Sequence, residues 1–106
     1  MELKLLWWRG CPSWRDALEQ VRGIADEIGL DERAVVVEEI ETDAEAEREG
    51  FVGSPTILVN GRDVQPPAEP EPPGLTCRVY HLRDGRVSPL PDPEDVRNAI
   101  RAAQLG

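Results

Sequence analysis

Hydrophobic and polar positions switch between strand-like and helix-like spacing along the first third of the chain. The apolar run 3–8 has the length and composition of a buried strand. After it, apolar residues recur at spacings of three and four and predict a helix that stops near Gly29. These residues are Trp14, Leu18, Val21, Ala25 and Ile28. The apolar run 34–40 predicts a second strand, which such a β-α-β unit places parallel to the first.

A second helix and a third strand follow. Thr42 and Glu45 have the spacing of a capping box, so we expect a short helix that starts there and ends at Gly50. Residues 56–59 predict the third strand, and Asn60-Gly61 behind it is typical of a tight turn.

Proline dominates the next segment. Residues 63–74 contain five prolines, which exclude a helix or a central strand and predict an extended surface loop. The run 75–82 predicts a fourth strand, and Asp92-Pro93 predicts the start of a last helix. We therefore expect a single α/β domain over residues 1–106, in the order β-α-β-α-β-β-α.

Charge and hydropathy limit the possible partners. The net charge of −9 disfavours nucleic acid, whose phosphates attract clustered Lys and Arg. No apolar run approaches the roughly 20 residues needed to cross a bilayer, and the first residues do not resemble a secretory signal. We expect a cytoplasmic protein that binds neither nucleic acid nor membrane.

The chain has two cysteines, Cys11 and Cys77, and one histidine, His81. Two distant cysteines are too few for a disulfide scaffold and match no compact zinc spacing. We expect no metal and no cofactor, and we expect the thiols to be either inert core residues or reactive groups.

Two segments resemble the thioredoxin superfamily. The first is the stretch from Gly10 to Trp14, GCPSW, between the first strand and the first helix. The second is the stretch 50–59, GFVGSPTILV, which leads into the third strand. With the Pro-rich loop and the late run LTCRVY, these segments resemble small bacterial thioredoxin-like proteins, some of them associated by annotation with organomercurial lyases. The resemblance implies a thioredoxin-like fold, with a central mixed sheet flanked by helices.

The same resemblance implies a site. Cys11 matches the first cysteine of the family's Cys-x-x-Cys motif, whereas the second falls on Trp14 and cannot resolve a mixed disulfide. Pro55 matches the family's cis-proline, and Ser54 before it would offer its backbone groups to a thiol-bearing substrate. Pro12 and Trp14 complete the substrate-binding residues that we expect around Cys11.

The position of Cys11 near the amino end of a helix predicts a lowered pKa and a reactive thiolate. Our first hypothesis is a thiol redox or thiol-transfer protein, whose single-cysteine active site forms a mixed disulfide with a protein or with a small thiol such as glutathione. A non-catalytic binding module with the same fold is an alternative.

Cys77 alternates with Val79, and this spacing predicts that both side chains face the core. Two alternatives give Cys77 a function instead. It can be a resolving thiol for Cys11, or the two thiolates together can hold a soft metal ion or an organomercurial. The sequence leaves the oligomeric state open.

Overall fold

A four-stranded mixed sheet forms the centre of the molecule. The computed structural model describes residues 1–105, apart from the side chain of Glu32. The strands are β1 (Leu3–Trp7), β2 (Val35–Glu39), β3 (Thr56–Val59) and β4 (Arg62–Asp63). They lie in the order β2-β1-β3-β4, with β2 parallel to β1, β3 antiparallel to β1, and β4 antiparallel to β3. The chain is therefore a mixed α/β protein.

Within residues 1–105, three α-helices lie around this sheet: α1 (Trp14–Ile28), α2 (Asp43–Glu49) and α3 (Pro93–Leu105). A short 3-10 turn, η1 (Glu32–Ala34), precedes β2. The predicted ends of α1 and α2 are confirmed, because Gly29 and Gly50 close them in the left-handed conformation. The predicted cap of α2 is also confirmed, since Thr42 Oγ1 accepts a hydrogen bond from the Glu45 amide at 3.1 Å.

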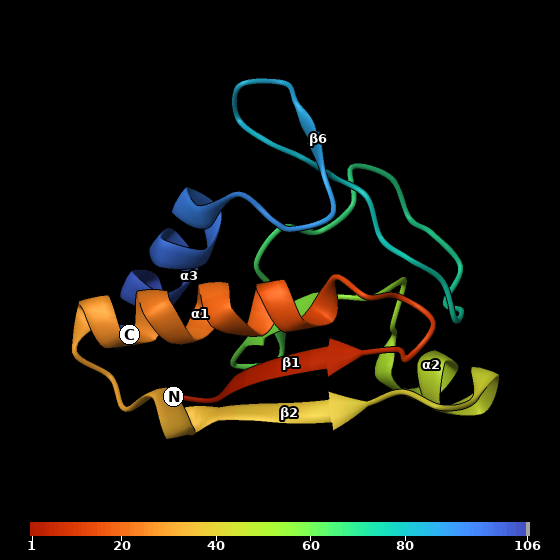
Figure 1. Cartoon of the computed structure of the whole chain (residues 1–106), viewed down its shortest axis with the longest axis horizontal. Helices are drawn as coiled ribbons and strands as arrows, with labels where there is room; N and C mark the ends of the chain where they lie inside the picture. Colours follow the sequence, from red (N-terminus) through yellow and green to blue (C-terminus); the bar gives the residue numbers. More distant parts are fainter. Residues whose placement is uncertain (106) are drawn as a thin grey trace.

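Two hydrophobic clusters pack on opposite faces of the sheet. Leu3 and Leu5 of β1 face α1 and α3, which lie side by side over one face (Figure 1). The side chain of Leu6 points to the opposite face of the sheet, where it packs against Ala46 of α2 and against Phe51. The alternation along β1 thus sets which helix covers which face.

The predicted fourth strand over 75–82 is confirmed only at Tyr80 and His81. The turn at Asn60-Gly61 is confirmed, and the chain returns at once as β4, which fills the edge of β3. The segment 75–82 therefore finds no place in the central sheet. It makes one isolated β-bridge, between Ser54 and Cys77, and the two-residue strand β5 (Tyr80–His81), which pairs with β6 (Val87–Ser88).

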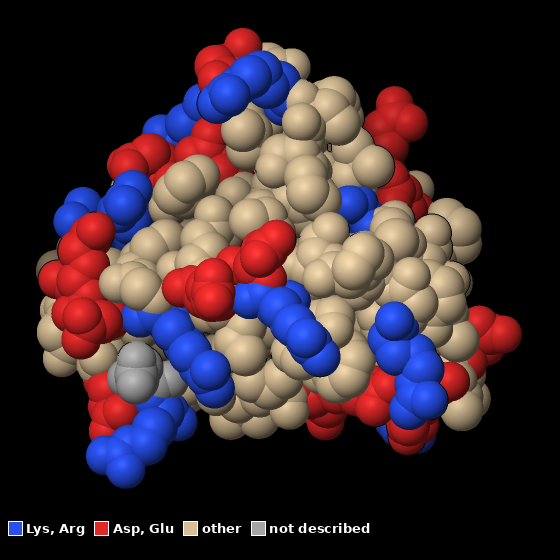
Figure 2. Space-filling model, viewed as in Figure 1, with Lys and Arg blue, Asp and Glu red and all other residues tan. Residues whose placement is uncertain are grey.

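Acidic and basic side chains lie next to one another over the face seen in Figure 2. Ion pairs account for part of this arrangement, for example Arg97 with Glu27 at 2.7 Å and Arg83 with Asp95 at 2.7 Å. None of the helices within residues 1–105 is long and apolar enough to cross a membrane.

Candidate functional site

Cys11 lies in the turn that joins β1 to α1. Its amide donates to the carbonyl of Trp8 at 3.1 Å, and α1 begins three residues later, after Ser13 as the helix cap. The side chain is buried, with only 2% of the residue exposed, and its thiol donates a hydrogen bond to the carbonyl of Ser54 at 3.5 Å. The predicted position before the helix is confirmed, but the thiol has almost no contact with solvent.

Ser54 is the second part of the site. The Ser54–Pro55 peptide bond is cis, the geometry expected from the sequence. The Ser54 amide donates to the carbonyl of Thr76, and its carbonyl accepts from the amide of Arg78, both at 2.8 Å. Its hydroxyl oxygen accepts from the amide of Trp8 at 3.0 Å. The backbone groups that we expected Ser54 to offer to a substrate are therefore occupied by residues 76–78 of the same chain.

This pairing brings Cys77 to Cys11. Both cysteines are free thiols, and hydrogen bonding to Cys11, followed by desolvation and by repulsion from Cys11, raises the pKa of Cys77 to about 11. Cys77 itself is exposed, and Val79 is 59% exposed, so the prediction that the two residues face the core is wrong. Both sequence alternatives that give Cys77 a function with Cys11 depend on this proximity of the two thiols.

Arg78 and Tyr80 occupy the buried face that we predicted for Cys77 and Val79. The Arg78 side chain is 5% exposed and reaches the Asp63 carboxylate at 2.6 Å. It also donates to the carbonyl of Gln65 at 2.6 Å and to Thr56 Oγ1 at 3.1 Å. These acceptors satisfy the guanidinium, so the charged residue turns inward and its neighbour Cys77 turns outward.

Tyr80 and Gly53 hold the same segment against the loop of Pro55. The buried Tyr80 hydroxyl donates to the carbonyl of Pro55, and burial raises the pKa of Tyr80. The Arg78 guanidinium lies over the Tyr80 ring at 4.4 Å from its centre. Gly53 has φ +147, and a Cβ atom placed there would lie 3.0 Å from the Cβ of Arg78. Only a glycine lets the two backbones approach so closely.

Cys77 opens into a cavity of about 630 Å³. The Pro-rich loop forms one wall, and residues 76–81 form the opposite wall. In Figure 1 these two segments run beside each other beyond the ends of β1 and β2. The lining residues include Cys77, Val52, Pro66, Pro67, Glu69, Glu71, Tyr80 and His81. Cys11 is not among them, so a molecule in this cavity meets the cysteine pair at Cys77.

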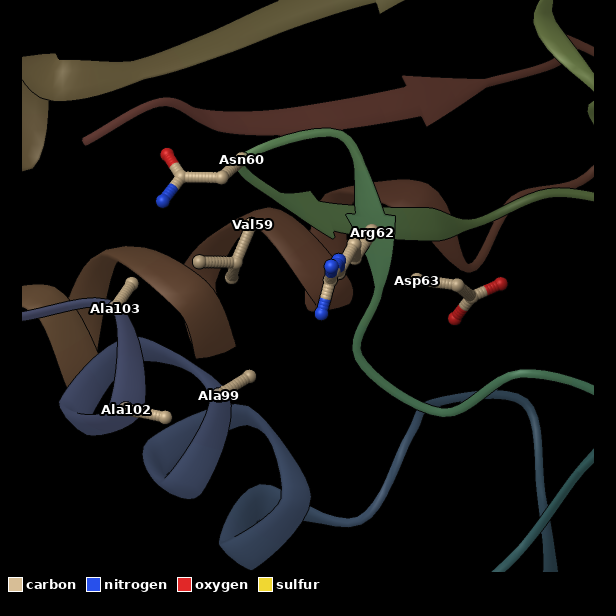
Figure 3. A pocket seen from close by; sticks show the side chains of 7 residues that line it. All are labelled: Val59, Asn60, Arg62, Asp63, Ala99, Ala102 and Ala103. Carbon is tan, nitrogen blue, oxygen red and sulfur yellow. The ribbon is translucent and has the colours of Figure 1, made fainter. Parts of the chain in front are cut away.

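A second cavity, of about 500 Å³, lies between α3 and the hairpin of β3 and β4 (Figure 3). Its floor is formed by Val59 and by small side chains of α3, and Arg62 and Asn60 stand at its sides. Val59 is the last residue of β3, whereas Ser54 and Pro55 precede the strand. This cavity is therefore at the other end of β3 from the cysteines.

Pro12 and Trp14 lie apart from the cavity that holds Cys77. Pro12 is exposed in the turn before α1. Trp14 stacks on Trp7, with ring centres 4.1 Å apart, and packs against the first hydrophobic cluster. The contacts of Trp14 are those of a packing residue. Within residues 1–105, no three His, Cys, Asp or Glu side chains form a group that could hold a metal ion.

Sequence reasoning missed Arg78, Asp63 and Tyr80. The only signal in the sequence was the alternation of side chains from Thr76 to His81. This alternation separates two sets of side chains but does not tell which set faces the core. Hydrophobicity alone favours Cys and Val inside over Arg, and no sequence rule pairs Arg78 with an aspartate on another segment.

Comparisons with known proteins add no relative. No family model matches the sequence, and no curated protein and no solved structure matches the chain.

Proposed function

We propose that the chain is a thioredoxin-like protein that carries out thiol–disulfide exchange, with Cys11 and Cys77 as its redox pair. The main support for this proposal is the pairing of residues 76–78 with Ser54, which sets Cys77 beside Cys11. Further support comes from the turn between β1 and α1, which carries Cys11, and from the cis-proline loop before β3. A mixed sheet with helices on its faces fits the same family.

In this proposal Cys77 supplies the second thiol, which the Cys-x-x-Cys position lacks because it is occupied by Trp14. The reduced pair gives two electrons and two protons to an external disulfide. One protein thiolate bonds to a sulfur of that disulfide and expels the first external thiol. The other protein thiolate then attacks the protein sulfur of the mixed disulfide, forms the Cys11–Cys77 bond and expels the second external thiol.

The test is the fate of the reduced protein with 2-hydroxyethyl disulfide. The natural sequence should lose both thiols and gain an intramolecular disulfide, with no bound adduct by intact mass. Cys11→Ala and Cys77→Ala should each be unable to release a second external thiol. Should the natural protein accumulate a stable adduct, or keep both thiols after equilibration, the redox pair does not exist.

The same juxtaposition favours a second candidate function, the binding of a soft metal ion or an organomercurial. Two thiolates suit a soft cation that accepts two ligands, and the described residues offer no third ligand of the usual kinds. Titration with Hg(II) alone should bind one ion per chain and remove both thiols together. Equal affinity in the natural protein and in Cys77→Ala would contradict this function.

A further inference from the structure

The cavity beside Cys77 has features that select a substrate. Its volume of about 630 Å³ accommodates a small organic molecule. Its apolar wall includes Val52, Pro66 and Pro67. Cys77 is the exposed member of the cysteine pair, while Cys11 is only 2% exposed.

The charge of the cavity is negative. Glu69 and Glu71 line it, and neither forms an ion pair with another residue of the described chain. Arg78 is the cation among the lining residues, but its guanidinium is held by the Asp63 carboxylate at 2.6 Å. A cationic ligand is therefore attracted and an anionic ligand is repelled.

We propose that small aminothiols, which carry a thiol and a cationic amine on a short carbon chain, enter this cavity and exchange with the Cys11–Cys77 disulfide at the sulfur of Cys77. This inference rests on the proposed redox pair and adds the point of attack and the class of substrate. The amine faces Glu69 and Glu71, the carbon chain lies along the prolines, and the thiol meets Cys77.

The exchange balances in two steps. The aminothiol thiolate forms a bond to the Sγ of Cys77, the bond between Cys77 and Cys11 breaks, and Cys11 leaves as a thiolate that takes a proton from water. A second aminothiol thiolate bonds to the sulfur of the first and releases Cys77, which is protonated in turn. One protein disulfide and two thiols thus become one protein dithiol and one small disulfide.

The first experiment measures charge selectivity on the oxidised protein. Cysteamine, 2-mercaptoethanol and 3-mercaptopropionate are compared at one pH, about pH 8. Each rate is divided by the rate of the same thiol with 2-hydroxyethyl disulfide. We expect cysteamine to exceed 3-mercaptopropionate by about tenfold in this ratio, and added salt to reduce the preference.

Two double variants, each with two fewer negative charges, test which acidic residues cause the preference for cysteamine. Glu69→Gln with Glu71→Gln should remove most of the preference. Glu19→Gln with Asp26→Asn, which removes the same charge from the exposed face of α1, should leave it unchanged. Equal normalised rates for the three thiols, or a preference that survives the loss of Glu69 and Glu71, would overturn the assignment.

The second experiment identifies the sulfur and does not need the intramolecular disulfide. Cys11→Ala and Cys77→Ala are each treated with cystamine, the disulfide of cysteamine, and the adduct is located by peptide mass. Cys77 should be modified at least about tenfold faster than Cys11, because its thiol is exposed. Faster modification of Cys11 would contradict the inference even if the redox pair exists. Absence of the intramolecular disulfide alongside selective modification of Cys77 would instead refute the proposed redox pair, and with it exchange at the Cys11–Cys77 disulfide, but would leave Cys77 as the sulfur that cystamine modifies.

Discussion

Replacement of Arg78 by methionine tests whether a buried ion pair holds the Cys77 segment. The Arg78 side chain is 5% exposed and the Asp63 side chain is 18% exposed, and they meet at 2.6 Å. Methionine keeps much of the volume but cannot donate to Asp63, to the Gln65 carbonyl or to Thr56 Oγ1. The variant therefore leaves Asp63 Oδ2 and the Gln65 carbonyl without the donor that Arg78 provides.

The expected cost is large for one residue. Removal of one partner from a buried ion pair destabilises a protein by about 3–5 kcal/mol, and we expect about 3 kcal/mol because Asp63 keeps some contact with water. Against a total stability of about 5–15 kcal/mol, this loss is measurable in a single urea titration. Arg78→Met with Asp63→Leu should regain at least half of the loss, since no charge is left unpaired.

Urea unfolding of the reduced protein, followed by tryptophan fluorescence, measures these differences. The control is Arg86→Met, which breaks an exposed ion pair with Asp84 and should cost less than about 1 kcal/mol. If Arg78→Met costs no more than Arg86→Met, the ion pair does not hold the segment. The same conclusion follows if the double variant is no more stable than Arg78→Met.

Four further predictions concern the same segment. Tyr80→Phe removes the donor of a buried carbonyl, so the unfolding free energy should fall by about 1–3 kcal/mol, and an unchanged urea midpoint would contradict this. Because the neighbouring thiol raises the pKa of Cys77 from 9.0 to about 11, the folded state holds that proton more tightly, and stability should fall as pH rises through this range. In Cys11→Ala, the midpoint of the Cys77 alkylation rate should move down towards pH 9.0, and an unmoved midpoint would exclude Cys11 as the cause. Gly53→Ala would bring a methyl group to 3.0 Å from the Cβ of Arg78 at φ +147, so we expect a loss of more than about 1 kcal/mol in urea unfolding.

The regular elements could be predicted because their signals are local. The stripe on α1, the cap at Thr42 and the left-handed glycines at 29 and 50 act within a few residues of the chain. The cis bond at Pro55 also agreed with the expectation from its surrounding segment. By contrast, most of the strand predicted over 75–82 is absent, because β4 fills the edge of β3 and keeps this segment out of the central sheet. No local signal within the segment reports this.

The candidate site also has features that local sequence determines and features that depend on distant contacts. The sequence by itself determined that Cys11 stands before a helix and that Cys77 and Arg78 point to opposite sides of one segment. Only the tertiary structure decided which side is inside. Asp63, Gln65 and Thr56 are far from Arg78 along the chain, and together they satisfy its guanidinium at a buried position. Burial of a charge depends on partners that folding brings together, and here those partners turn Cys77 outward, beside Cys11.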